Sequence, residues 1–185
     1  MLQDFGRIIE TDVVAVGGSG AGITAAVYAA RAGARVALVS KGKIGVSGNA
    51  IMAGGGFGVD GESGKNLLHL DFADPSFTKE RLFDCIVKES FYLADQNMVR
   101  QYVDDGPIVM KDYLGWAERA GQDFFCCPPA NWIASGLSFT KALVQGLKET
   151  AGIQTFEDMM IVEVLTNEKT VCGAVGIDIY TGEAV

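Results

Sequence analysis

The chain opens with a short apolar run, a cluster of glycines and a stretch of small residues. Four consecutive apolar residues, Val13–Val16, are typical of a buried strand. Apolar positions then recur at helical spacing over Ile23–Ala32, and Gly33 suits the end of a helix. Ala34–Val39 is a second apolar run. This order predicts a strand–helix–strand unit of about 30 residues.

The middle of the chain has the periodicity of several helices. We expect Thr78 to cap the start of one helix and Asp95 to cap the next. Gly106–Pro107 is expected to interrupt the second helix and to begin a third, because proline suits a first helical turn. Gly121 ends that pattern, and Ser138–Glu149 is predicted as a further helix capped by its own first residue.

Two segments have no clear period. Lys41–Gly64 is rich in glycine, and we expect a loop that is neither a regular helix nor a central strand. Because Ile51 and Phe57 are apolar, order around a flat ligand is favoured over a flexible linker. Phe124–Gly136 is predicted to be an irregular loop.

The last part of the chain has the pattern of strands. The predicted strands are Ile153–Phe156, Met159–Thr166 and Val171–Ile179. Asn167–Thr170 has the length and composition of a hairpin loop between the last two. After Glu183 we expect a strand that returns to the sheet, with Ala184–Val185 as its start. The sequence therefore predicts an α/β fold with inserted helices and a C-terminal β-meander.

Composition narrows the classes of partner. The 185 residues carry a formal net charge of −8, which argues against nucleic acid and against adsorption to anionic lipid. No apolar run reaches the length of a membrane span, so we expect no direct membrane insertion. Met1–Glu10 lacks the apolar core of a signal peptide, and the expected location is cytoplasmic.

The cysteines and the single histidine offer little chemistry. The spacing of the four cysteines fits neither a zinc site nor an iron–sulfur site, and we expect no metal. Reduced, partly buried thiols are the favoured interpretation, while a redox role of Cys126 and Cys127 stays open. His69 has no evident partner and is expected to be structural or exposed.

The glycine cluster carries the chemistry of the first unit. A dinucleotide diphosphate binds where a glycine turn leads from a strand into a helix, because free N–H groups meet its negative charge there. Gly17 and Gly22 match the first and last positions of the G-x-G-x-x-G pattern, whereas Ser19 replaces the middle glycine. The candidate contacts are Gly17, Gly18, Ser19, Gly20, Ala21 and Gly22. The alternative is a structural glycine turn in another α/β protein.

The residue after the second strand separates two kinds of dinucleotide. A nicotinamide or flavin site usually has an acidic residue there, which binds the ribose hydroxyls. Ser40 occupies that position here, followed by Lys41. A serine binds ribose less strongly than a carboxylate does, which disfavours a nicotinamide-binding domain in particular.

Several segments together resemble a known family. They are Val39–Gly42, Ser47–Ala50, Gly54–Gly56 and the pattern of Thr140–Glu183. In these the chain resembles the flavoprotein subunits of fumarate reductase and succinate dehydrogenase, together with L-aspartate oxidase and adenylylsulfate reductase. The resemblance implies a Rossmann-like FAD-binding domain.

The resemblance assigns roles to residues along the cofactor. Gly17, Ser19, Ala21 and Gly22 would cradle the FAD diphosphate, while Ser40 and Lys41 would contact the adenosine end. The phosphate and ribityl stretch falls to Ser47, Asn49 and Ala50, the flavin ring to Gly54 and Gly55, and the adenine edge to the Met160 backbone. Covalent members have a histidine where this chain has Gly48, which implies noncovalent FAD.

The resemblance also sets what the chain is expected to contain. In such proteins a capping domain supplies the groups that bind a dicarboxylate and deliver a proton. We expect residues 1–185 to be the N-terminal portion of the FAD-binding domain, incomplete at the C-terminus and without that cap, and we assign no catalytic residue.

The implied reaction is hydride transfer between flavin and a small, dicarboxylate-like substrate. An iron–sulfur electron-transfer subunit is an implied partner. The alternatives are a noncatalytic flavin-binding module or remnant that needs a partner chain, and a flavoenzyme that acts on a steroid or a sulfur compound. The first 60 residues do not distinguish these, because specificity is determined elsewhere in such proteins.

Overall fold

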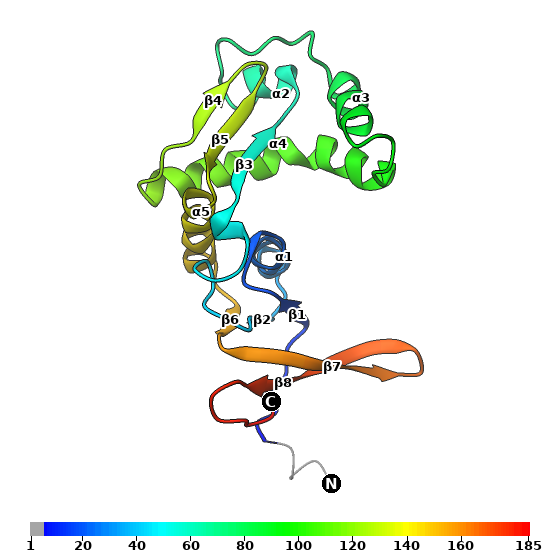
Figure 1. The fold of residues 1–185 in the computed structure, drawn as a ribbon, viewed down its shortest axis with the longest axis vertical. Coiled ribbons are helices and arrows are strands. Elements are labelled where there is room, and N and C mark those ends of the chain that lie inside the picture. The colour runs from blue at the N-terminus through cyan, green and yellow to red at the C-terminus, as the bar shows by residue number, and fades with distance from the viewer. Residues whose placement is uncertain (1–5) are drawn as a thin grey trace. The chain divides into compact units, whose positions relative to one another are not determined.

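The computed structural model describes residues 6–185, which form two compact units (Figure 1). The first unit contains residues 6–53 and Leu143–Val185, and the second contains Gly54–Ala142. Residues 1–5, the first half of the segment judged for a signal peptide, lie outside the described residues.

A three-stranded parallel sheet forms the centre of the first unit. Its strands are β1 (Val13–Val16), β2 (Val36–Val39) and β6 (Ile153–Phe156), in the order β1-β2-β6. Helix α1 (Gly20–Arg31) connects the first two strands, and Gly33 follows it with a φ of +94°. The predicted strand–helix–strand unit is therefore confirmed, although β2 begins two residues later than expected.

Both faces of this sheet are covered around β2, whose four residues are all buried. Ile23, Ala26 and Val27 are fully buried on α1, which packs against β1 and β2. Residues of alternate parity face the other way. There Val39 and Phe156 form one cluster with Ala37 and Met159. This packing fixes the C-terminal end of β2 between a helix and the next segment of chain.

The C-terminal strands differ in their partners. The first of the three predicted strands, β6, joins the parallel sheet, whereas β7 (Met159–Asn167) and β8 (Thr170–Asp178) form an antiparallel hairpin. Glu168 and Lys169 both have positive φ, as a two-residue hairpin turn requires. Ala184 pairs with Ile177, so the expected returning strand begins as predicted.

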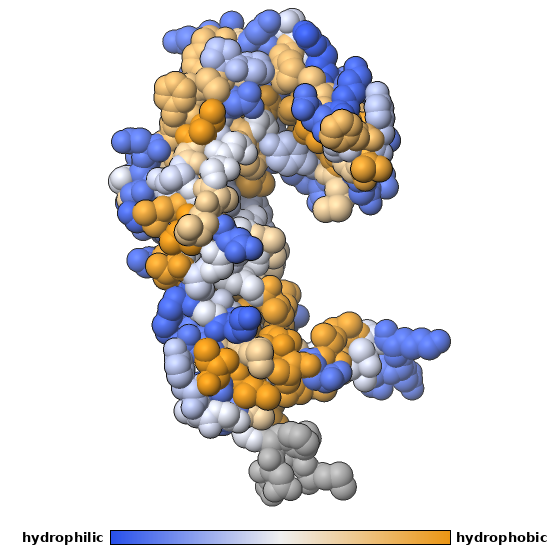
Figure 2. All heavy atoms as spheres, in the orientation of Figure 1, coloured by the Kyte–Doolittle hydropathy of each residue, from blue (hydrophilic) through white to orange (hydrophobic). Residues whose placement is uncertain are grey.

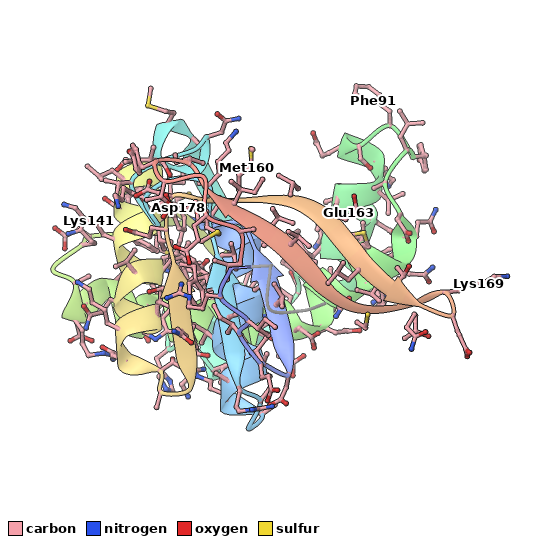
Figure 3. All side chains as sticks on the ribbon, turned by 90° about the horizontal axis from the view of Figure 1, so that it is seen from below. Phe91, Lys141, Met160, Glu163, Lys169 and Asp178 are labelled. Atoms are coloured by element: carbon pink, nitrogen blue, oxygen red, sulfur yellow. The ribbon has the colours of Figure 1, made fainter. Side chains whose placement is uncertain are left out.

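The hairpin is polar at its far end and apolar at its base (Figure 2). Lys169 lies at the tip, while Met160 and Asp178 lie near the base (Figure 3). Met159 is buried in the cluster on β2 and β6, and Ile161 packs against the same cluster. The base of the hairpin is therefore anchored to the parallel sheet by two apolar side chains.

An ion pair closes the other end of the parallel sheet and should depend on pH. Asp12 accepts hydrogen bonds from the Arg35 guanidinium (2.8 and 3.1 Å) and from the Arg35 N–H (2.9 Å), which lower the pKa of Asp12 to about 2. A carboxylate with a lowered pKa stabilises the fold above its ordinary pKa and loses that effect as the pH falls through the lowered value.

We therefore expect Asp12→Asn to be less stable than the wild type at neutral pH, with a difference that vanishes between about pH 4 and pH 2. Urea unfolding at a series of pH values measures this. A difference that grows on acidification would contradict the assignment.

The second unit combines a small antiparallel sheet with helices. Its strands are β3 (Gly54–Gly58), β4 (Phe125–Cys127) and β5 (Asn131–Ser135), in the order β3-β5-β4. Its helices are α2 (Gly61–Asn66), α3 (Lys79–Glu89) and α4 (Gln96–Arg119). Helix α5 (Gly136–Glu149) begins in this unit and ends in the first, which also contains the short 3-10 helix η1 (Ala50–Met52).

The predicted caps of α3 and α4 are confirmed, but the predicted break is wrong. Thr78 accepts the Arg81 N–H and Asp95 accepts the Asn97 N–H. Helix α4 continues through Pro107. A proline inside a helix costs about 3 kcal/mol. Here the buried face of α4 runs without interruption across it: Val99, Val103, Gly106, Pro107, Met110, Tyr113. Tertiary packing outweighs the local signal.

Three further expectations are corrected. Phe124–Gly136 is not an irregular loop, because β4 and β5 form a hairpin in which Trp132 is buried and Pro128–Pro129 lies in the turn. The glycine-rich segment contains an edge strand, β3, and the start of a helix, α2, capped by Asp60. Helix α5 begins at Gly136, and the Ser135 hydroxyl accepts the Ser138 N–H at 3.2 Å.

A tyrosine joins α4 to the glycine strand. The Tyr102 hydroxyl donates to Gly58 O (2.9 Å) and accepts from Gly58 N–H (3.1 Å), and burial raises the pKa of Tyr102. Its ring lies 5.3 Å from that of Phe57. The side chain therefore holds the end of β3 through both backbone groups of one residue.

Tyr102→Phe should destabilise the protein by about 2 kcal/mol, because it leaves two backbone groups of Gly58 without their partner. Chemical unfolding measures the change. Tyr92→Phe is the matched control, since Tyr92 is 67% exposed and should tolerate loss of its hydroxyl. Equal stability of the two variants would contradict the role of Tyr102.

Candidate cofactor site

The glycine turn after β1 is closed by a backbone contact that only glycine permits. Gly17 has a φ of +113°, and its N–H donates to Val39 O at 2.7 Å. A Cβ on Gly22 would lie 1.8 Å from Gly17 O, far inside contact distance. Gly22 is therefore glycine because the first turn of α1 passes directly over the end of β1.

The N-terminus of α1 presents N–H groups that the helix itself does not use. The first intrahelical bond runs from Ile23 N–H to Ser19 O (2.9 Å). The N–H groups of Gly20, Ala21 and Gly22 thus precede the first intrahelical donor. Ser19 is the N-cap, yet its side chain makes no capping hydrogen bond. A Cβ on Gly20 would meet no described atom within 4 Å, so the space beside the turn is open.

The loop after β2 packs onto this turn. A Cβ on Gly18 would lie 2.7 Å from Ser40 Oγ and 2.9 Å from Ile44 Cγ1, and Gly45 N–H donates to Gly18 O at 3.1 Å. Ser40 is only 6% exposed, and its backbone bonds Phe156 O and Met159 N–H. The structure thus brings Ser40 to the glycine turn, as the sequence predicted.

Two lysines follow Ser40, and they differ in their surroundings. Lys43 makes ion pairs with Glu157 and Asp158, whose hydrogen bonds raise the pKa of Lys43 above its usual range. Lys41 is exposed and makes no ion pair with a residue of the described chain. Of the two, Lys41 has its charge available for an anionic ligand, which agrees with the predicted site.

The remaining loop residues are exposed or half-buried. Ser47 donates its hydroxyl to Lys43 O at 2.6 Å, which leaves its oxygen lone pairs as acceptors. Asn49 precedes η1 without capping it through its side chain, and Ala50 is the first residue of η1. Their contacts with the cofactor stay a prediction.

Met160 is less favourable than the sequence suggested. The Met159 N–H donates to Ser40 O, and the Ile179 N–H donates to Asp158 O. Because backbone groups alternate in direction along an antiparallel strand, the N–H and C=O of Met160 point to Ile177 of β8. The Met160 backbone is thus engaged in the hairpin and does not offer a free group to adenine.

Gly54 and Gly55 belong to the second unit and are glycine for different reasons. A Cβ on Gly55 would lie 2.7 Å from the ring of Phe139. A Cβ on Gly54 would meet no described atom within 4 Å. The two residues face opposite sides of β3. Gly54 therefore offers open space to a flat ligand, whereas Gly55 is explained by packing inside the unit.

The open face of this sheet also carries apolar residues that the sequence did not reveal. Ile133 pairs with both Gly56 and Phe125, and the side chains of Ile133 and Phe125 are 50% and 70% exposed. The hairpin that presents them was expected to be irregular, so its alternation was not used. These residues extend the side of β3 on which Gly54 lies.

The two adjacent cysteines do not have the features of a reactive pair. Cys126 and Cys127 are neighbours on β4, and burial raises the pKa of the Cys126 thiol. A thiol with a raised pKa is a weaker nucleophile at neutral pH, because the thiolate is the reactive form. The geometry supports a structural role for Cys126.

The sequence comparison identifies the class of protein. The FAD binding domain family matches residues 12–131, which include the glycine turn, the loop after β2 and strand β3. The chain belongs to this family of FAD-binding domains. The donor set fits the cofactor: free N–H groups precede Ile23, and the space beside Gly20 and Gly54 is open.

Among curated proteins the chain is similar to the A subunit of the fumarate reductase (CoM/CoB) of Methanothermobacter marburgensis. The two are 26% identical over 97% of this chain and 33% of that protein. The expected resemblance to fumarate reductase flavoproteins is thereby confirmed. The chain spans about a third of the length of this relative.

Solved structures share the fold. FrdA of E. coli quinol fumarate reductase matches with a TM-score of 0.75 and 23% identity, over 96% of this chain and 31% of that one. Adenylylsulfate reductase of Archaeoglobus fulgidus matches with a TM-score of 0.73 and 21% identity, over 96% and 29%. At this identity the likeness concerns the fold. Within residues 6–185, every helix is too short or too polar to serve as a membrane span.

Proposed function

We propose that this chain binds FAD noncovalently, with the diphosphate at the N-terminus of α1. The observation that supports this most strongly is the set of N–H groups of Gly20, Ala21 and Gly22 beside an open space. A helix N-terminus attracts negative charge through these groups and through the helix dipole. Membership of the FAD-binding family points to the same ligand.

The other candidate residues would follow the cofactor outward from this point. Ser40 and Lys41 would contact the adenosine end, since Ser40 packs against the glycine turn and Lys41 has an unused charge. Ser47, Asn49 and Ala50 would line the phosphate and ribityl stretch. Gly54 would leave room for the flavin ring, with Gly55 beside it in the strand.

Gly48 supports noncovalent attachment. This residue stands where covalent relatives of the resembled family have a histidine, and it offers no nucleophilic side chain. Its φ of +86° is a conformation that favours glycine. Acid precipitation of the FAD-loaded protein should therefore release all of the flavin into the supernatant, and flavin retained in the pellet would contradict this.

For the whole protein we propose an oxidoreductase of the fumarate reductase and succinate dehydrogenase type. The flavin would supply hydride transfer to or from a small, dicarboxylate-like substrate. Residues 1–185 would form part of the FAD-binding domain, with substrate binding and catalysis in a separate capping domain. A cytoplasmic location and an iron–sulfur partner complete this proposal, which rests on the similarity to the M. marburgensis fumarate reductase.

A titration tests the proposed cofactor against its main rival. The purified chain is titrated with FAD and separately with NADH, and flavin fluorescence and calorimetry report binding. We expect saturable binding of FAD and much weaker binding of NADH, because Ser40 replaces the acidic residue that a nicotinamide site uses. Preferential binding of NADH would overturn the proposal.

A further inference from the structure

Three charged side chains connect the loop after β2 to the segment between β6 and β7. Lys43 Nζ lies 3.1 Å from Glu157 Oε2 and 2.5 Å from Asp158 Oδ2. Glu157 Oε1 also accepts the Ile44 N–H at 2.8 Å. We call these residues the Lys43–Glu157–Asp158 cluster. Its lysine and its carboxylates lie more than a hundred residues apart in the chain, and no local pattern indicated that they meet.

The cluster continues, through Ile44 and Gly45, to the glycine turn. The Ile44 N–H is held by Glu157, the Ile44 side chain packs beside Gly18, and the next N–H, that of Gly45, donates to Gly18 O. The loop is therefore fixed on one side to the β6–β7 connection and on the other to the turn that precedes α1.

Lys43 also organises the rest of the loop through its carbonyl. Both the N–H and the hydroxyl of Ser47 donate to Lys43 O, at 3.0 and 2.6 Å. The side chain of Lys43 thus anchors the loop, while its backbone sets the position of Ser47. Asp158 is held in turn: its φ is +57°, and its carbonyl accepts the Ile179 N–H of the hairpin.

We propose that the Lys43–Glu157–Asp158 cluster is a positioning device that fixes residues 41–50 against the glycine turn and thereby sets the affinity for FAD. This inference rests on the proposed function. The cluster itself does not touch the cofactor. Lys43 is used inside the protein, and Lys41 is the lysine that faces the anionic ligand.

The sign of one substitution separates positioning from direct electrostatics. Glu157→Gln removes a negative charge near an anionic ligand, so simple charge attraction predicts tighter FAD binding. Positioning predicts weaker binding, by about fivefold, because the charge-assisted bond to Ile44 and the ion pair to Lys43 are both lost. Lys43→Met should have a similar effect, and Lys43→Arg should restore most of the affinity because it keeps the charge.

Glu163→Gln is the matched control, since Glu163 is an exposed carboxylate on β7 (Figure 3). It makes the same change in charge and should leave FAD affinity unchanged. Tighter binding by Glu157→Gln, or equal losses in Glu157→Gln and Glu163→Gln, would overturn the proposal.

Amide hydrogen exchange of the protein without FAD gives a reading that does not depend on the cofactor. Glu157→Gln and Lys43→Met should speed the exchange of the Gly45 and Ser47 amides, and Lys43→Arg should not. Unchanged exchange would overturn the proposal, as would faster exchange with unchanged FAD affinity. If the wild type binds no FAD, the proposed function fails, and these rates still decide whether the cluster orders the loop.

Discussion

Gly22→Ala is expected to abolish tight FAD binding and to destabilise the protein. The added methyl group would lie 1.8 Å from Gly17 O, so either the turn or the first turn of α1 must move. Overpacking against backbone costs about 3 kcal/mol or more, since no flexible side chain can yield. FAD affinity should fall by about a hundredfold, because the displaced N–H groups no longer converge on the diphosphate.

Gly20→Ala is the matched control for stability. It is the same substitution two residues earlier in the same turn, at a position where the Cβ meets no described atom. Its unfolding free energy should equal or slightly exceed that of the wild type, because alanine favours a helix more than glycine does. Chemical unfolding of both variants, with FAD titration of Gly22→Ala, checks this. Equal stability of Gly20→Ala and Gly22→Ala would contradict the close approach.

Gly54→Val is expected to separate cofactor binding from folding. The side chain would enter open space on an edge strand, where a β-branched residue is favourable, so stability should change by less than about 0.5 kcal/mol. If the flavin ring lies against Gly54, the same side chain occupies its place. The FAD dissociation constant should then rise by about thirtyfold, an effect of about 2 kcal/mol.

Two variants of the same strand complete this experiment. Gly56→Val adds the same side chain farther along β3 and should lower FAD affinity less than Gly54→Val does. Gly55→Ala should instead lose stability, because its Cβ would press on the ring of Phe139. Unchanged FAD affinity in Gly54→Val would remove Gly54 from the cofactor site, whereas lost stability would show that the space is not open.

Local signals were sufficient for the first unit's framework. The apolar run of β1, the small residues of α1 and Gly33 each determine structure within a few residues, and the caps at Thr78 and Asp95 act over one helical turn. The glycine turn could likewise be predicted, because its requirement is steric and local. These parts of the fold follow from interactions close in sequence.

The errors arise where distant packing decides. Pro107 remains inside α4 because residues on both sides of it are buried, and Trp132 anchors a strand because it is buried in the second unit. The contacts of Lys43 with Glu157 and Asp158 join residues that are far apart in sequence. The engagement of Met160 by β8 depends on hairpin register. None of these could be read from a short window of sequence.

A crystal structure of the chain with FAD tests the central claim most directly. We predict diphosphate oxygens within hydrogen-bonding distance of the N–H groups of Gly20, Ala21 or Gly22, beside the turn that Gly17 and Gly22 close. Density for the diphosphate elsewhere on the protein, with these N–H groups covered by side chains, would contradict it.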